Sequence, residues 1–187
     1  MKRIVILASG SGSNAENIIN YFKESPNVEV SAVLTNKHTA KVLERCDRLN
    51  TPGFYFNRAA FTASDTVVQF LQGLEVDLIV LAGFLWKIPS NIIDAFPDKI
   101  INIHPALLPK YGGKGMYGEK VHQAVKDNLE PETGITIHYV NEHYDEGAII
   151  FQAKTSISPE DDAATIAQKV HQLEYEHFPK VIEKLLL

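Results

Sequence analysis

The sequence predicts an α/β protein with a single domain: a mostly parallel, Rossmann-like sheet with helices on both faces and an antiparallel strand pair toward the C-terminus. Two observations predict this class. Short apolar runs alternate with helical patterns along residues 4–81, which is the order of β-α-β units joined by right-handed crossovers. The apolar runs are nearly continuous and rich in β-branched residues, as in strands that are covered on both faces.

Each element follows from its local pattern. The apolar runs predict strands over 4–8, 28–34, 54–56, 77–81 and 99–104. The periodic segments between and after them predict helices over 15–22, 40–49, 65–74 and 119–126. Two later segments, 133–140 and 148–155, alternate like an antiparallel pair. Ser158 and Pro159 mark the entry of a last helix, which begins near residue 161 and continues to the C-terminus.

Composition excludes several classes of protein. The 187 residues carry a formal net charge of −5, so the chain lacks the basic surface of a nucleic-acid-binding protein. Cys46 is the single cysteine, which excludes an intrachain disulfide and a cysteine metal cluster. No apolar run reaches the roughly 18 residues of a membrane helix, and the N-terminus begins as a strand rather than a signal peptide. We therefore expect a cytoplasmic protein, a monomer or weak homodimer, that acts on small molecules.

Polar residues close the strand expected over 99–104. Asn102 and His104 are two residues apart, so an extended strand projects both side chains to the same side. Pro105 ends the strand immediately afterwards, and ligands of open α/β sheets bind at this carboxyl edge. Either residue alone is explained by hydrogen bonds to nearby backbone, but the pair at a strand end indicates a site. Asp145, in a loop between the last two expected strands, adds a carboxylate.

A glycine-rich turn, from Gly10 to Asn14, links the first expected strand to the first helix. Such a turn allows close backbone approach, and the helix N-terminus favours an anion. A dinucleotide is less well supported, because Ala15 stands where the fingerprint requires a third glycine and no acid follows the second strand. The turn therefore favours a lone phosphate. A structural role, with Ser13 as the N-cap, is compatible with that interpretation.

Four segments carry a family resemblance. They are the nonapeptide 6–14, Leu81-Ala82-Gly83-Phe84, the decapeptide 102–111 and the stretch 134–147, which runs from Gly-Ile-Thr-Ile-His-Tyr-Val into Tyr-Asp-Glu-Gly. Together they resemble the folate-dependent formyltransferases, and among them the phosphoribosylglycinamide formyltransferases. Methionyl-tRNA formyltransferases carry an additional C-terminal domain and formyltetrahydrofolate deformylases an additional N-terminal one, and this chain has room for neither.

The resemblance implies a reaction and its residues. The cosubstrate would be 10-formyltetrahydrofolate, the formyl acceptor would be the amine of glycinamide ribonucleotide, and no metal would be required. One formyltransferase domain would span 1–187, with the nucleotide phosphate held by about 1–100 and catalysis and folate binding by about 80–187. The implied catalytic residues are Asn102, His104 and Asp145, with His138 in a supporting role. The implied nucleotide contacts are Gly12, Ser13, Asn14 and Glu174. The implied folate contacts are Arg58, Leu85, Trp86, Lys87, Ile88 and Asn102.

The chemistry expected of this set is oxyanion stabilisation and proton transfer. Asn102 and a protonated His104 would donate to the formyl oxygen, and Asp145 would raise the pKa of His104 and assist proton transfer. The remaining histidines, including His122 and His171, are expected mostly as surface or capping residues. The loop 110–118 is longer and richer in glycine than is common in the family, which leaves its substrate contacts open.

Two other functions stay open from the sequence. A non-catalytic phosphate- or nucleotide-binding module would need only the glycine-rich turn, and it would leave Asn102, His104 and Asp145 without an evident use. A folate- or nucleotide-sugar-dependent formyltransferase acting on a different amine would retain those three residues. The phosphate turn at residues 12–14 and the short chain weigh against this second alternative.

Overall fold

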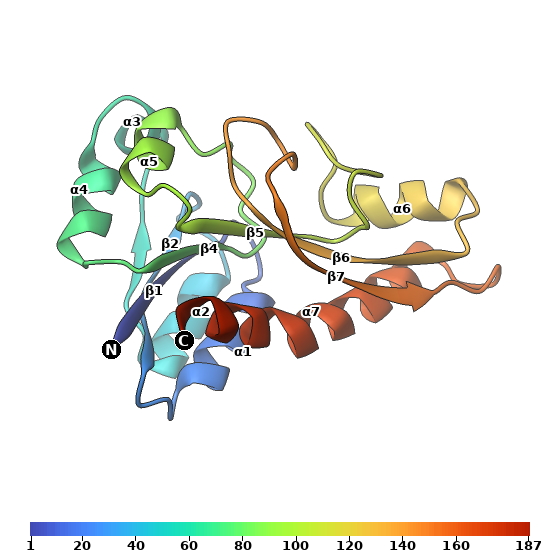
Figure 1. The fold of residues 1–187 in the computed structure, drawn as a ribbon, viewed down its shortest axis with the longest axis horizontal. Helices are drawn as coiled ribbons and strands as arrows, with labels where there is room; N and C mark the ends of the chain where they lie inside the picture. Colours follow the sequence, from blue (N-terminus) through green and yellow to red (C-terminus); the bar gives the residue numbers. More distant parts are fainter.

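One seven-stranded sheet organises the chain in the computed structural model, which describes all of residues 1–187 (Figure 1). The strands are β1 (Lys2–Leu7), β2 (Val28–Thr35), β3 (Gly53–Tyr55), β4 (Leu78–Leu81), β5 (Ile100–His104), β6 (Glu132–Tyr139) and β7 (Ile149–Ser156). They lie in the order β3-β2-β1-β4-β5-β6-β7. Strands β1 to β5 pair in parallel, whereas β5–β6 and β6–β7 are antiparallel. The predicted fold class is confirmed.

Seven helices connect the strands. They are α1 (Ser13–Phe22), α2 (Val42–Leu49), α3 (Arg58–Thr62), α4 (Thr66–Gly73), α5 (Ser90–Ala95), α6 (Glu119–Asp127) and α7 (Ala163–Leu186). The sequence patterns did not predict α3 or α5. These helices have only 5 and 6 residues, too few to show a helical repeat of apolar positions. The start of α3 is nevertheless encoded locally, because the Asn57 side chain accepts a hydrogen bond from the Ala60 backbone N–H.

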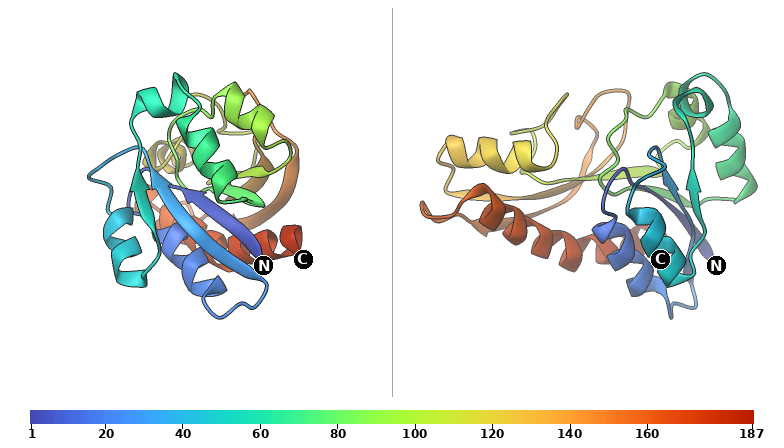
Figure 2. Two further views of the ribbon diagram at one scale, coloured as in Figure 1. Left: turned by 90° about the vertical axis from the view of Figure 1, so that its left-hand side faces the viewer. Right: turned by 180° about the vertical axis from the view of Figure 1, so that it is seen from behind.

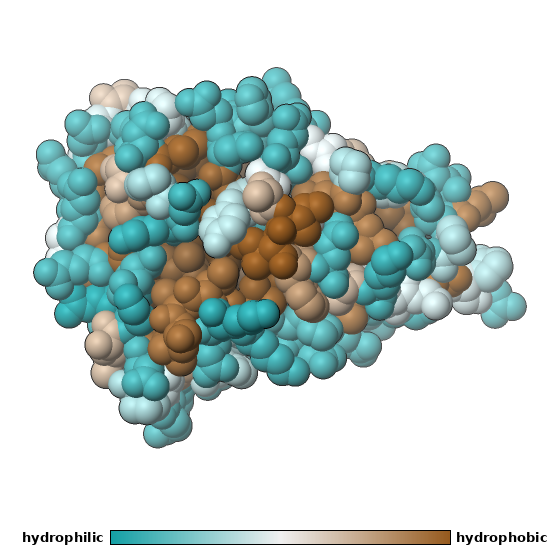
Figure 3. Space-filling model, in the orientation of Figure 1, coloured by the Kyte–Doolittle hydropathy of each residue, from teal (hydrophilic) through white to brown (hydrophobic).

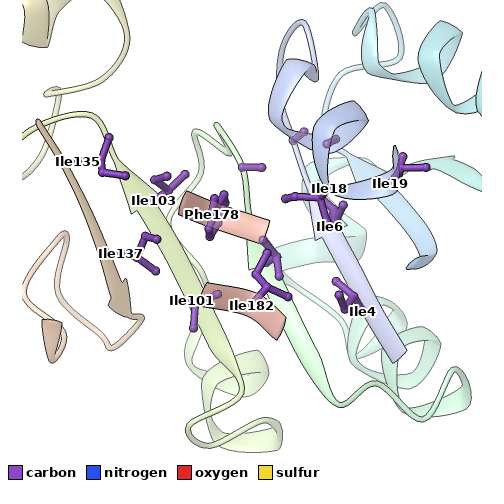
Figure 4. Close-up of a cluster of buried hydrophobic side chains, with 14 of the residues drawn as sticks. Ile4, Ile6, Ile18, Ile19, Ile101, Ile103, Ile135, Ile137, Phe178 and Ile182 are labelled. Carbon is purple, nitrogen blue, oxygen red and sulfur yellow. The ribbon is translucent and has the colours of Figure 1, made fainter. Parts of the chain in front are cut away.

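Two apolar cores lie on opposite faces of the sheet. Alternate residues of β1 divide between them: Ile4 and Ile6 belong to the larger core, Val5 and Leu7 to the smaller one. Helices α1 and α7 cover the larger core, where their isoleucines and Phe178 meet the side chains of β1, β5 and β6 (Figure 4). Helices α3, α4 and α5 cover the smaller core. The end-on view shows these two layers of helices with the sheet between them (Figure 2).

The β5–β6 pair departs from this apolar pattern on one face. Asn102 stands opposite His138 in the register, and His104 stands opposite Thr136. The intervening residues of both strands, among them Ile103, point to the larger core. The segment after β5 lies over the polar face, because the Thr136 hydroxyl accepts from the Leu108 N–H at 3.0 Å and donates to the Ala106 carbonyl at 2.7 Å. Loops therefore cover this part of the sheet.

The surface carries a mixture of polar and apolar residues. In the orientation of Figure 1, apolar side chains gather toward the middle of the face and hydrophilic ones surround them (Figure 3). None of the helices combines the length and the apolar composition that crossing a membrane requires.

Replacing Phe178 by alanine tests the larger core. The ring is fully buried between α7 and the sheet, so the substitution should lower the free energy of unfolding by about 3–5 kcal/mol. Leu187→Ala, at a residue that is 67% exposed, is the matched control and should change it by less than about 0.5 kcal/mol. Urea unfolding monitored by circular dichroism measures both changes. Equal effects of the two substitutions would contradict this assignment of the core.

Candidate active site

A cavity of about 790 Å³ lies at the carboxyl ends of β1, β4 and β5. The chain leaves β1 toward β2 and β3 on one side, and it continues from β4 to β5 on the other. The cavity therefore lies at the topological switch point, the place where open α/β sheets bind ligands. Two loops form its floor: Ser9–Asn14 after β1 and Leu81–Ile88 after β4. Ser9 ties them together, because its hydroxyl accepts a hydrogen bond from the Leu85 N–H at 2.9 Å.

The glycine-rich turn opens α1 toward the cavity. Gly12 precedes the helix and has a φ of 74°, in the left-handed region. A Cβ at this position would lie 2.3 Å from Val42 Cγ2, so glycine is required both for conformation and for space. The sequence-based interpretation of Ser13 as the N-cap is wrong: Ser13 is the first residue of the helix, and no side chain caps it. The N–H groups of the first turn therefore have no side-chain acceptor, which favours an anion.

A buried carboxylate stands beside this turn. Glu174 on α7 is 5% exposed and accepts hydrogen bonds from Asn14 Nδ2 and His171 Nδ1, each at 2.8 Å. The hydrogen bond to Glu174 raises the pKa of His171 despite partial burial, which favours its charged form. Asn14 Oδ1 is buried without a partner and is therefore an acceptor available to a ligand. The cavity thus contains a partly exposed imidazole, close to the expected phosphate position, whose charged form Glu174 favours.

His122 on α6 also lines the cavity, and the expectation of a surface or capping residue is wrong for it. The side chain is 3% exposed, and Nδ1 has no hydrogen-bond partner. Burial lowers its pKa, and the neighbouring His171 adds to that effect. A sequence signal existed, because His122 lies between Val121 and Val125 on the buried face of its helix. His171 lies at the surface as expected, but it faces the same cavity.

The predicted catalytic residues lie together. His104 Nδ1 is 3.5 Å from Asp145 Oδ2, and His138 Nε2 is 3.6 Å from Asp145 Oδ1. Asn102 Nδ2 lies 3.2 Å from His138 Nε2. Both histidines are buried, and the Asp145 side chain is 12% exposed. Two residues from β5, one from β6 and one from the β6–β7 loop therefore meet at one edge of the cavity.

Backbone carbonyls fix the neutral tautomers of both histidines. His104 Nε2 lies 2.7 Å from the Tyr111 carbonyl, and His138 Nδ1 lies 2.8 Å from its neighbour's carbonyl at Tyr139. Because a carbonyl oxygen only accepts, each of these ring nitrogens carries a proton. In its neutral form His138 accepts from the Asn102 amide through Nε2. Neutral His104 presents an unprotonated Nδ1 beside Asp145.

The pKa of His104 moves opposite to the prediction. Asp145 acts in the expected direction, but burial of the ring is the larger effect and lowers the pKa of His104 below its ordinary value. Burial also raises the pKa of Asp145, yet the interactions with His138, His104 and the Gly113 N–H together hold it below its ordinary value. The pair at neutral pH is therefore a neutral imidazole beside a carboxylate, rather than an imidazolium–carboxylate pair.

The residues predicted for the folate wall do not all line the cavity. Leu85, Trp86, Lys87 and Ile88 all line the cavity, as does every other predicted site residue except Arg58. The Arg58 guanidinium lies 5.1 Å from the centroid of the Trp86 ring. The indole also lies near a cluster of phenylalanine rings, with ring centroids 5.8–6.4 Å from those of Phe56, Phe61 and Phe84. Arg58 therefore stands beside the wall of the cavity. No three histidine, cysteine, aspartate or glutamate side chains are grouped as ligands of a metal ion.

Comparison with known proteins gives a consistent result. The family model described as formyl transferase matches residues 2–182. A phosphoribosylglycinamide formyltransferase of Bacillus subtilis is 40% identical over 194 residues, covering 100% of this chain and 95% of the relative. One from Haemophilus influenzae is 38% identical over 189 residues, covering 98% of this chain and 86% of the relative.

Solved structures agree with the sequence relatives. The glycinamide ribonucleotide transformylase 1 of Geobacillus kaustophilus superposes with a TM-score of 0.90 at 33% identity, covering 100% of both chains. The phosphoribosylglycinamide formyltransferase of Streptococcus pneumoniae superposes with a TM-score of 0.89 at 28% identity, again over 100% of both chains. With the family match over nearly its whole length, the chain belongs to the formyl transferase family.

Proposed function

We propose that this protein transfers the formyl group of 10-formyltetrahydrofolate to the primary amine of N1-(5-phosphoribosyl)glycinamide, the step of purine biosynthesis that forms formylglycinamide ribonucleotide. The observation that carries the proposal is the convergence of Asn102, His104 and Asp145 at one edge of a cavity whose floor holds an anion-binding turn. The names of relatives that match over the full chain support the choice of acceptor.

The nucleotide would occupy the part of the cavity between β1 and α7. Gly12, Ser13 and Asn14 offer backbone N–H groups to its phosphate, and the charged form of His171 adds a cation on the same side. Glu174 is placed to accept hydrogen bonds from ribose hydroxyl groups. In this arrangement about 1–100 supplies the phosphate turn, and about 80–187 supplies the catalytic residues and the folate wall, together with His171 and Glu174.

The formyl folate would lie against the loop after β4. Leu85, Trp86 and Ile88 give this wall an apolar and aromatic surface for the folate rings. Arg58 serves the anionic glutamate tail only if that tail passes beyond the wall, because its guanidinium lies over Trp86 outside the cavity. Asn102, at the end of β5, faces both ligands.

The reaction would proceed by direct attack. The amine nitrogen forms a bond to the formyl carbon, and negative charge develops on the formyl oxygen, where the second N–H of the Asn102 amide donates to it. The unprotonated Nδ1 of His104 accepts the proton that the amine loses, directly or through water. The proton then passes to the departing folate nitrogen as the carbon–nitrogen bond to folate breaks. Asp145 stabilises the transient imidazolium.

An absorbance assay of folate deformylation tests the proposal. With glycinamide ribonucleotide present the protein should convert 10-formyltetrahydrofolate to tetrahydrofolate, and without the nucleotide it should not. Asn102→Ala should lower kcat roughly 10²–10³-fold, because it removes a donor to the oxyanion, and His104→Ala should abolish turnover. Equal folate turnover without nucleotide would indicate a hydrolase, and nucleotide binding without turnover would indicate a binding module. Either result would overturn the proposal.

The pH dependence of kcat/KM tests the protonation state of His104, because this parameter reports the pKa values of the free enzyme. Because neutral His104 is the proton acceptor and its pKa is lowered, kcat/KM should fall on the acid side with an apparent pKa below 6.5, the ordinary value. Asp145→Asn removes the negative charge that favours the imidazolium, so this acid limb should move to still lower pH while the maximal rate falls. Protonation of the substrate amine would not respond to this substitution. An unmoved or raised acid limb would contradict the assignment.

A second glycine outside the cavity makes a matched pair with Gly12. Gly12→Ala should raise KM for the nucleotide at least tenfold, since the new Cβ would displace the turn from Val42 and the backbone is left-handed there. Gly73→Ala, at the end of α4, is the control, because a Cβ at that position meets nothing within 4 Å and Gly73 does not line the cavity. Steady-state kinetics with each substrate varied, together with isothermal titration with the nucleotide, measures both variants. Similar nucleotide KM values for both would place the phosphate elsewhere.

A further inference from the structure

The backbone segment Tyr111–Gly113 contacts both members of the central catalytic pair. The Tyr111 carbonyl accepts the proton of His104 Nε2 at 2.7 Å. Two residues later, the Gly113 N–H donates to Asp145 Oδ2 at 2.9 Å. A single short segment therefore sets the tautomer of His104 and one hydrogen bond of the carboxylate that faces it.

This segment approaches the site closely and has an unusual backbone. Tyr111 has a φ of 59°, a left-handed conformation that is uncommon for a residue with a side chain. At Gly112 a Cβ would lie 2.6 Å from Leu108 Cδ2 and 3.3 Å from Asp145 Cβ, so the loop passes where no side chain fits. A non-glycine residue in such a position needs contacts elsewhere to keep it there.

The Tyr111 side chain supplies those contacts on the side of the loop away from His104. Its hydroxyl donates to Glu130 Oε1 at 2.8 Å, and Lys110 Nζ donates to both oxygens of the same carboxylate, at 2.8 and 3.1 Å. The Tyr111 ring packs against the larger core. Burial and the hydrogen bond to Glu130 raise the pKa of Tyr111 to about 12, so the phenol keeps its proton at working pH.

We propose that the Tyr111–Glu130 hydrogen bond is a positioning device for catalysis, holding the Tyr111 carbonyl and the Gly113 N–H against His104 and Asp145. This role in catalysis rests on the proposed function. Neither Tyr111 nor Glu130 lines the main cavity, so both are positioning residues rather than catalytic ones. Lys110 strengthens the device by fixing the carboxylate that receives the phenol.

A neighbouring ion pair provides the control. Lys154 Nζ donates to Glu132 Oε1 at 2.7 Å, and this pair borders the same small cavity behind the loop as Lys110 and Glu130. It makes no hydrogen bond to Tyr111, whose hydroxyl is bonded to Glu130. Glu132→Ala therefore removes a carboxylate of the same kind from the same region without touching the positioning device.

The experiment compares Tyr111→Phe, Glu130→Ala, Glu130→Gln and Glu132→Ala with the unsubstituted protein. We expect Tyr111→Phe and Glu130→Ala to lower kcat roughly tenfold or more, with KM for both substrates within about twofold, because the catalytic groups are misplaced while the binding residues stay. Glu130→Gln keeps an acceptor for the phenol and should restore most of kcat. Glu132→Ala should resemble the unsubstituted protein.

A nitrogen-15 NMR titration of the His104 ring gives a readout that does not depend on turnover. A less well aligned carbonyl stabilises the imidazolium less, so the His104 titration should move to lower pH in Tyr111→Phe and Glu130→Ala, with a smaller fraction of the Nε2-protonated tautomer. The titration in Glu132→Ala should not move.

The two readouts separate the two proposals. Unchanged His104 titration in folded Tyr111→Phe and Glu130→Ala would overturn the positioning role, whatever the activity. A shifted titration in a protein that transfers no formyl group would support the positioning of the His104 ring and overturn the proposed function instead. The Glu130 side chain is partly exposed, at 19%, and lies outside both apolar cores, so Glu130→Ala tests the inference if Tyr111→Phe fails to fold.

Discussion

The hydrogen-bonding requirements of one polar patch on the β5–β6 pair govern how the chain is arranged around the cavity. The patch consists of Asn102, His104, Thr136 and His138. Buried polar groups are costly unless they are paired, and an apolar helix laid over this face would leave them unpaired. The chain instead covers the patch with loops, whose free carbonyl and N–H groups supply the partners. Because loops rather than a helix cover the patch, it also remains next to the cavity.

The covering loops set the chemistry of the patch as well as its stability. Two carbonyl groups determine which nitrogens of His104 and His138 carry protons, and one N–H group holds Asp145. Burial lowers the pKa of His104 and the charge of Asp145 raises it, and burial is the larger effect. The outcome is a proton acceptor with a carboxylate beside it, a pair suited to receiving a proton from an attacking amine and releasing it again.

The sequence predicted those features that depend on local pattern. Strand parity placed Asn102 and His104 on one side, and the glycine pattern located the turn that opens α1. The sequence did not predict features that depend on how deeply a side chain is buried or on contacts with backbone atoms. The lowered pKa of His104 follows from how deeply its ring is buried. The hydrogen bond from this ring to the Tyr111 carbonyl involves the backbone, so a pattern of side chains does not reveal it. His122 was missed although Val121 and Val125 mark the buried face of its helix, because a single histidine on such a face does not show that it lines a cavity.

Strand order relates the two ends of the proposed substrate. The proposed phosphate turn follows β1, and the proposed catalytic residues Asn102 and His104 lie on β5, with β4 between the two strands. Two strand spacings amount to about 10 Å, which is comparable to the span of a ribosyl group that carries a phosphate at one end and an amine arm at the other. The loop after β4 lies between these two positions, and a hydrogen bond from the Leu85 N–H to the Ser9 hydroxyl joins this loop to the proposed phosphate turn. A folate bound along the loop would therefore approach the amine from the side. The order and spacing of three parallel strands thus determine the distance over which the two ligands must be brought together.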